Sequence, residues 1–290
     1  MNNIIFCSSA KHLKPSLSIE LKSQTIETSL RFFTGGEVAI CLLPEGRGLD
    51  TQDVYIVQSF GLHDVNNSLI ELLFTIEAAK NSGAKKIHVI IPYMAYSRQD
   101  RRLDANSSFG LKVIASFLNN SGIASLTTID LHSSSSIDLF AMLVVNIPGM
   151  DLVEAANVSK DKIIVSPDLG GFKRSAFKAT VHFTKERKGG LLSLALQGDV
   201  NGKDCLIIDD IIDTGRTICL AAEMLMQNGA RSVECFTTHA LFSEETCRLV
   251  NESPLSRIIV SNSIANTHLP KLVEIVEISQ VISSVIGSHH

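Results

Sequence analysis

The chain has 290 residues, of which 45% are hydrophobic and 19% charged, and it contains no Trp. This composition excludes a disordered or coiled-coil protein and indicates a globular α/β protein with a sizeable core. The formal net charge of −4 argues against nucleic acid or an anionic membrane as the main partner. An anionic substrate therefore has to be bound by local clusters of cations.

The length predicts about two domains. We expect an N-terminal domain over 1–148 and a C-terminal domain over 149–286, and we interpret 287–290 as the remnant of an expression tag. No apolar run approaches the roughly 18 residues that span a bilayer, and the start lacks the plan of a signal peptide, so we expect a cytoplasmic protein. The six cysteines form no Cys-x-x-Cys pair and are interpreted as reduced core residues: Cys7, Cys41, Cys205, Cys219, Cys235 and Cys247.

Strands and helices alternate along most of the chain. The first 53 residues are the least legible, with a weak strand at 4–7, an amphipathic segment at 17–21 and an apolar run at 38–43. Thereafter the pattern predicts strands and helices in turn, at 54–57, 67–80, 87–91, 108–120 and 125–129. The same alternation returns at 163–165, 171–179, 181–183, 205–208, 217–228, 232–237 and 258–260. Short loops between such elements predict two mainly parallel sheets flanked by helices.

The most informative stretch is 205–217. An apolar run of strand length leads to two adjacent carboxylates, Asp209 and Asp210, and then to a short turn that opens onto a helix: Asp213, Thr214, Gly215, Arg216 and Thr217. Hydroxyls and backbone N–H groups at a helix N-terminus bind phosphate, and carboxylates accept hydrogen bonds from hydroxyls. The stretch therefore predicts a site for a ribose 5-phosphate group, although an acidic strand end with an N-capping Thr would look similar.

A second cluster follows the strand at 87–91. It contains Arg98, Gln99, Arg101 and Arg102. Guanidinium groups bind phosphates in a bidentate manner, so the cluster predicts a clamp for a nucleoside triphosphate. The alternative is a solvated basic loop.

Three further segments carry candidate side chains. His132 follows the strand at 125–129, Asp168 follows the strand at 163–165, and Lys185 and Arg187 lie in a cationic segment that ends in two glycines. A His near a carboxylate holds Mg²⁺ on a nucleotide, and a mobile basic loop neutralises charge during group transfer. Alone, His132 is more typical of a surface or satisfied core residue and the cationic segment of a solvated hairpin tip. The Asp168 segment could be only a tight turn and an N-cap.

Taken together, the motifs that begin at Pro92, Asp130, Ser166, Lys185, Gly198 and Asp209 resemble, in order and spacing, those of the ribose-phosphate pyrophosphokinases. The resemblance runs from about Phe33 to His239. It implies two phosphoribosyltransferase-like domains. It also implies transfer of the β,γ-pyrophosphoryl group of MgATP to the anomeric hydroxyl of ribose 5-phosphate.

The resemblance also implies roles for single residues. Arg98, Gln99 and Arg101 would bind ATP, and a neighbouring subunit would contribute Phe33 and Glu37 to the adenine site of a homodimer or homohexamer. His132 and Asp168 would position Mg²⁺, Asp168 also facing the substrates, and Lys185 and Arg187 would be the catalytic cations. The ribose phosphate would lie against the stretch described above, with Asp209 and Asp210 on its hydroxyls and its phosphate held by Asp213, Thr214, Gly215, Arg216 and Thr217.

The chain departs from the family pattern at three places. Thr34 and Gly35 replace residues of an adenine-contacting motif, and 133–140 differs from the segment that contributes to subunit contacts and a regulatory anion site. Arg216 stands where the family usually has a second Gly, and its guanidinium would meet either the 5-phosphate or a second phosphate on a larger acceptor such as ADP-ribose. A catalytically silent regulatory subunit is a further alternative, and a phosphoribosyltransferase ranks lowest because it would not need the Arg98 cluster.

Overall fold

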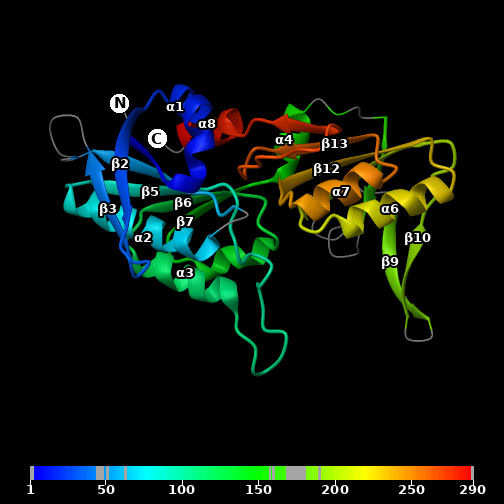
Figure 1. Ribbon diagram of the computed structural model, residues 1–290, viewed down its shortest axis with the longest axis horizontal. Coiled ribbons are helices and arrows are strands. Elements are labelled where there is room, and N and C mark those ends of the chain that lie inside the picture. Colours follow the sequence, from blue (N-terminus) through cyan, green and yellow to red (C-terminus); the bar gives the residue numbers. More distant parts are fainter. Residues whose placement is uncertain are drawn as a thin grey trace. The chain divides into compact units, whose positions relative to one another are not determined.

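The computed structural model describes residues 3–43, 49, 52–61, 64–156, 158, 161–167, 181–188 and 191–288, with the backbone alone at 185–188, 191–194 and 287–288. Two compact units make up the chain (Figure 1). Unit 1 comprises Met1–Ile147, Ser263–Ala265 and Ile278–His290, and unit 2 comprises Pro148–Asn262 and Asn266–Glu277. The expected boundary at 148/149 lies beside the first crossing between units, but the returns of the chain to unit 1 were not predicted.

Unit 1 contains a sheet of seven strands, in the order β3-β2-β1-β4-β5-β6-β7. All neighbours are parallel except β2 and β3, which form an antiparallel hairpin at one edge. The carboxyl ends of the parallel strands therefore share one edge of the sheet, where ligands of such folds bind. The strands are β1 (Asn3–Phe6), β2 (Gln24–Phe32), β3 (Val38–Leu43), β4 (Asp53–Val57), β5 (Lys86–Ile91), β6 (Ser125–Ile129) and β7 (Leu143–Ile147).

Helices cover both faces of this sheet. Its helices are η1 (Ser8–Leu13), α1 (Lys14–Glu20), α2 (Val65–Asn81), α3 (Gly110–Asn120), η2 (Ser134–Leu139) and α8 (Ser279–Ser288). Figure 1 shows α2 and α3 on one side of the sheet and α1 with α8 on the other. Helix α8 contacts α1 and buries Ile282 and Ile286, four residues apart, so the segment expected at the end of the second domain completes the core of unit 1. The backbone of Gly287 and Ser288, within the expected tag remnant, continues α8.

Unit 2 repeats this plan, with strand order β10-β9-β8-β11-β12-β13-β14 and one antiparallel pair, β9 and β10, at an edge. Its strands are β8 (Ile163–Ser166), β9 (Val181–Lys188), β10 (Leu191–Gln197), β11 (Asp204–Ile212), β12 (Ser232–Ala240), β13 (Arg257–Ser261) and β14 (Val273–Val276). Its described helices are α4 (Gly149–Ala155), α6 (Arg216–Gln227) and α7 (Glu244–Glu252). Apolar side chains of the central strands and of α6 form the core.

The expected fold class, two mainly parallel sheets flanked by helices, is confirmed. The expected helix at 171–179 lies outside the described residues. Within the part of the chain that the structure describes, no helix has both the length and the apolar character to cross a membrane. All six cysteines are free; four are buried, as expected, but Cys41 is exposed and Cys247 only half-buried.

Candidate functional site

In unit 1 the arginine cluster begins in a loop that follows β5. Tyr93 and Met94 are buried and anchor this loop, and Tyr96 takes a positive φ of 64°. An aromatic residue in the left-handed region is uncommon, and the surrounding structure has to hold such a backbone in place. The turn is closed by the N–H of Gln99, which donates to the Tyr96 carbonyl at 2.8 Å. Arg98 and Gln99 thus leave the sheet from a fixed turn and have exposed side chains.

Helix α3 fixes Gln99 a second time. The N–H of Leu111 donates to the Gln99 carbonyl at 3.2 Å. The Gln99 side chain lies over Gly110, where an added Cβ would approach the Gln99 Cβ to 3.2 Å. A larger residue at 110 would therefore displace the Gln99 side chain. Arg101, beyond this turn, is exposed.

His132 leaves the neighbouring strand, β6. The Ile129 N–H donates to the Pro92 carbonyl at 3.2 Å, so the ends of β5 and β6 are joined at the point where both loops begin. Asp130 has a positive φ of 49°, and the Leu131 N–H donates to Asn146 Oδ1 at 3.0 Å. The half-buried His132 therefore leaves the strand end next to that of Arg98.

Phe33 and Glu37 lie at the tip of the β2–β3 hairpin. The Phe33 N–H donates to the Glu37 carbonyl at 2.8 Å, and Gly36 has a φ of 86°, which closes a tight turn. Phe33 is 59% exposed, an unusual state for a large aromatic residue at a hairpin tip. Phe33 follows β2 and Arg98 follows β5, and two strands of the sheet, β1 and β4, lie between β2 and β5. The sheet therefore keeps Phe33 apart from Arg98 of the same chain.

In unit 2, Asp209 and Asp210 do not follow the strand as expected but lie within it. Strand β11 pairs with β8 only up to Ile207, whereas its pairing with β12 continues through Asp209, which is opposite Thr237. The acidic residues therefore occupy an extension of β11 that has β12 as its described neighbour. Both carboxylates are half-buried, and Asp209 Oδ1 accepts a hydrogen bond from the Asp210 N–H at 3.0 Å.

The extension leads into the turn that opens α6. Gly215 is the N-cap residue of α6 and has a φ of 76°, which favours glycine. Asp213, Thr214 and Thr217 are exposed around it, and among the described residues no side chain caps the helix start. This turn, 213–217, is called the phosphate turn below, because it offers backbone N–H groups and two hydroxyls at a helix N-terminus.

Arg216 is not a free cation beside this turn. Its guanidinium Nη2 lies 3.2 Å from Glu245 Oε1, at the start of α7, and both side chains are more than half exposed. The sequence suggested that Arg216 would face a phosphate of the acceptor. In the structure the exposed guanidinium contacts a carboxylate 29 residues away, and its contact with a phosphate of the acceptor stays a prediction.

Two domains of known proteins match the chain. The N-terminal domain of ribose phosphate pyrophosphokinase matches residues 2–122, and the phosphoribosyl synthetase-associated domain matches residues 172–290. A ribose-phosphate pyrophosphokinase of Vibrio cholerae is 37% identical over 269 residues, which cover 88% of this chain and 83% of the relative. The chain belongs to the ribose-phosphate pyrophosphokinase family.

Two further relatives agree with this membership. Ribose-phosphate pyrophosphokinase 2 of Saccharomyces cerevisiae is 33% identical over 84% of this chain and 81% of its own length. The crystal structure of phosphoribosylpyrophosphate synthetase from Mycobacterium smegmatis has a TM-score of 0.88 and 25% identity, covering 99% of this chain and 98% of that one. The family and the enzyme class expected from the sequence, an ATP-dependent diphosphokinase, are thereby confirmed.

The remaining family positions are only partly described. The backbone of Lys185 and Arg187 belongs to β9, paired with Leu194 and Leu192 of β10, so the expected cationic loop is one arm of a hairpin. The sequence of this segment has no clear two-residue alternation of apolar and polar side chains, so no strand was predicted. Its backbone pairing with β10 makes it a strand. Asp168 lies outside the described residues.

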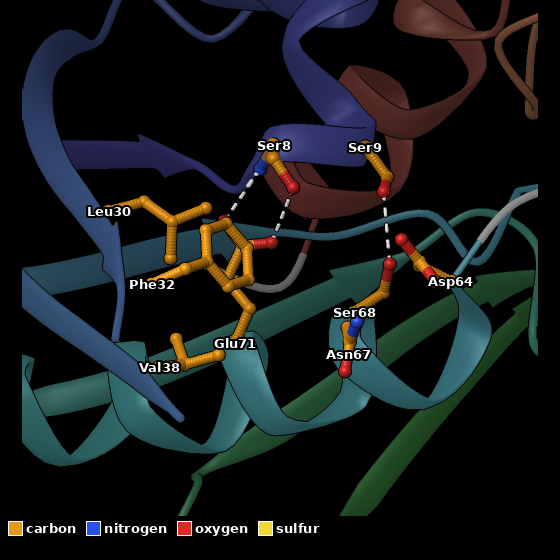
Figure 2. A pocket seen from close by; sticks show the side chains of 9 residues that line it. All are labelled: Ser8, Ser9, Leu30, Phe32, Val38, Asp64, Asn67, Ser68 and Glu71. Atoms are coloured by element: carbon orange, nitrogen blue, oxygen red, sulfur yellow. Dashed lines mark hydrogen bonds between the residues drawn. The ribbon is translucent and has the colours of Figure 1, made fainter. Parts of the chain in front are cut away.

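A separate cavity of about 170 Å³ lies beside the start of α2 (Figure 2). Glu71 forms its floor, 4% exposed, and accepts hydrogen bonds from the Ser8 N–H at 2.8 Å, the Ser8 hydroxyl and Gln58 Nε2 at 3.3 Å. The carboxylate thus joins the ends of β1 and β4 to α2. The sequence did not identify Glu71 as special, although an acid beside Leu72 on the apolar side of a predicted helix is the signal that would have found it.

Proposed function

We propose that the chain transfers the β,γ-pyrophosphoryl group of ATP to the anomeric hydroxyl of ribose 5-phosphate, giving phosphoribosyl pyrophosphate and AMP. The observation that carries the proposal is the end of β11, where two half-buried carboxylates lead into the phosphate turn at the N-terminus of α6. A ligand with vicinal hydroxyls and a terminal phosphate matches both features. The names and coverage of the relatives support the same reaction.

The acceptor is held by unit 2 in this proposal. Asp209 and Asp210 accept hydrogen bonds from the ribose hydroxyls, and the backbone N–H groups of 213–217 bind the 5-phosphate, with the hydroxyls of Thr214 and Thr217 adding further donors. The positive end of the α6 dipole favours the phosphate dianion. Holding the sugar at both ends fixes its anomeric hydroxyl for attack, which is the main requirement of phosphoryl-type transfer.

ATP is held by unit 1. The guanidinium groups of Arg98 and Arg101 bind the polyphosphate, and Gln99 offers an amide to the nucleotide. Phe33 and Glu37 serve the adenine of a second copy in a homodimer or homohexamer. Two observations support this: the hairpin tip exposes Phe33, and two intervening strands separate β2 from β5 by about 14 Å within one sheet.

Magnesium is the metal that this donor set fits. Mg²⁺ takes one or two carboxylates together with substrate phosphates and keeps several waters. Asp209 and Asp210 supply two adjacent, half-buried carboxylates of this kind. His132 and Asp168 would position the ion, as the family resemblance implies, and the Asp209–Asp210 pair would hold it at the acceptor, where it would neutralise phosphate charge.

In the transfer, the anomeric oxygen forms a bond to the β-phosphorus while the bond from that phosphorus to the α–β bridging oxygen breaks. AMP leaves, and the proton of the hydroxyl is lost. The ammonium of Lys185 and the guanidinium of Arg187 stabilise the charge on the transferring group. A glycine-ended hairpin arm that closes over the phosphates would also exclude water.

The two alternatives have less support. A larger acceptor such as ADP-ribose was suggested by Arg216 in place of the family's usual second Gly, whereas the names of the relatives give ribose phosphate. A silent subunit would have no use for Lys185, Arg187 and His132 together.

The test is AMP release from ATP and Mg²⁺ with ribose 5-phosphate or with ADP-ribose as acceptor. We expect release that depends on ribose 5-phosphate, and absence of release with both acceptors would refute the proposal. Lys185→Ala should lower kcat by at least about a hundredfold while ATP binding changes little, because its charge acts in the transition state. Lys203→Ala, which removes an exposed cation paired with Asp199, is the control and should keep wild-type turnover.

A further inference from the structure

The first turn of α7 lies against the phosphate turn and makes specific contacts with it. Helix α7 lies beside α6 (Figure 1). It begins after Ser243, whose hydroxyl oxygen accepts a hydrogen bond from the Thr246 N–H at 3.1 Å. Thr246 is 1% exposed, and its hydroxyl donates to the Asp213 carbonyl at 2.9 Å. A buried side chain of α7 therefore holds the first carbonyl of the phosphate turn.

The direction of these hydrogen bonds follows from proton counting. The Thr246 hydroxyl has one proton, and the Asp213 carbonyl has none, so Thr246 is the donor in that bond. The contact of 2.8 Å between the Ser243 and Thr246 hydroxyl oxygens must then use the Ser243 proton. Ser243 donates to Thr246, and Thr246 donates to Asp213. The chain of bonds has one consistent arrangement, which makes the position of the Asp213 carbonyl well defined.

Fixing this carbonyl also fixes an N–H group. The Asp213 carbonyl and the Thr214 N–H belong to the same peptide plane, and no described peptide bond is cis. In a trans peptide the C=O and N–H point in opposite directions. Because the carbonyl points toward α7, the Thr214 N–H points away from α7, to the exposed side of the turn.

The methyl group of Thr246 restrains the other end of the turn. A Cβ added to Gly215 would lie 3.2 Å from Thr246 Cγ2 and 3.5 Å from Val250 Cγ2. The Gly215 backbone is thus packed directly on α7, in the left-handed conformation that its φ of 76° shows. Both ends of the Asp213–Gly215 segment rest on the same buried threonine.

We propose that Thr246 is a positioning residue for the acceptor: its hydroxyl orients the Asp213–Thr214 peptide so that the Thr214 N–H donates to the 5-phosphate. The proposal rests on the proposed function, in which 213–217 binds that phosphate. Thr246 itself does not touch the substrate. Its contribution is to remove the freedom of a peptide that would otherwise have to be ordered when the phosphate binds.

The test compares Thr246→Val with Thr246→Ser. Valine keeps the methyl group that packs on Gly215 and replaces the hydroxyl by a second methyl, whereas serine keeps the hydroxyl and removes the methyl. We expect Thr246→Val to raise the KM for ribose 5-phosphate about tenfold, which is the loss of one hydrogen bond to a charged group, with kcat and the KM for ATP unchanged. Thr246→Ser should stay within about twofold of wild type in all three constants. Glu252→Gln, in the last turn of α7, is the matched control and should match wild type.

The outcomes separate this proposal from the proposed function. No AMP release by the wild-type protein with ribose 5-phosphate overturns the function itself. An active wild type whose Val variant keeps its KM for ribose 5-phosphate, or loses kcat and both KM values alike, overturns the positioning role. If Thr246→Val does not fold, Thr246→Ala is compared with Thr246→Ser, because these two variants differ only in the hydroxyl: a KM for ribose 5-phosphate about tenfold higher in the Ala variant supports the role of the hydroxyl, and equal values overturn it.

Discussion

Replacing Glu71 by Gln should destabilise unit 1 without making a cavity, because the two side chains have nearly the same shape. The amide has one oxygen where the carboxylate has two, so its NH₂ group must take the place of Oε1 or Oε2. At Oε1 it would face the Ser8 N–H, which is also a donor. At Oε2 it would face Gln58 Nε2, again a donor, although the Ser8 hydroxyl there can reverse and accept.

Placing the NH₂ group at the Oε2 position costs less free energy, and this orientation therefore determines the expected loss of stability. It leaves one buried donor–donor conflict, at about 1–3 kcal/mol, and removes the charge that strengthens the remaining bonds. We therefore expect a loss of about 2–3 kcal/mol of unfolding free energy, which corresponds to a fall in Tm of about 5–10 °C. Solvent gives little compensation, because Glu71 is only 4% exposed.

The assay is thermal unfolding of the full chain by circular dichroism and calorimetry. Glu77→Gln is the control on the same helix, because Glu77 is 64% exposed and its contacts are weak, a 4.0 Å ion pair with Lys80 and a 3.5 Å hydrogen bond from the Asn81 amide. Its Tm should change by less than about 2 °C. Equal Tm values for the two variants would show that Glu71 does not join β1 and β4 to α2.

Two predictions concern unit 2. Glu234→Ala should lower the unfolding free energy by about 2–4 kcal/mol, because it leaves the ammonium of Lys162, 14% exposed, without its carboxylate. The loss is measured from the urea midpoint, and a loss equal to that of the exposed control Glu223→Ala would contradict this reason. Asp204 should contribute to acid sensitivity, because hydrogen bonds from the Arg231 guanidinium hold its pKa well below the usual 3.8. A depressed folded-state pKa gives stability that is complete above about pH 4 and is lost as the pH falls toward the folded-state pKa. Asp204→Asn should therefore flatten the decline of Tm below pH 4, and an unchanged slope would rule out this contribution.

The parts of the fold that the sequence predicted are those with strong periodicity. Leu69, Leu72 and Ile76 lie three and four residues apart, and α2 is where they indicate a helix. Strand β2 was missed because Ile26 is its single buried residue, so its sequence shows no alternation of buried and exposed side chains. Helix α7 was missed because it is largely polar, although Ser243 followed by two glutamates is an N-terminal helix signal.

The candidate site shows the same limit. Asp209 and Asp210 were predicted to follow a strand, because carboxylates usually end an apolar run, but pairing with Thr237 continues β11 past them. The contacts of Thr246 and Glu245 with the phosphate turn join residues about 30 positions apart. Such contacts depend on how α7 packs on α6, which no local pattern in the sequence encodes.

The inclusion of α8 in unit 1 has a consequence for synthesis on the ribosome. Domains usually fold in the order in which they emerge, the N-terminal one first. Here α1 and the sheet of unit 1 wait for Ile278 and the helix that follows it, which are translated on the order of ten seconds after Ile147. Unit 2 is nearly complete before then. During that interval the nascent chain therefore exposes the apolar surface that α8 later covers with Ile282 and Ile286.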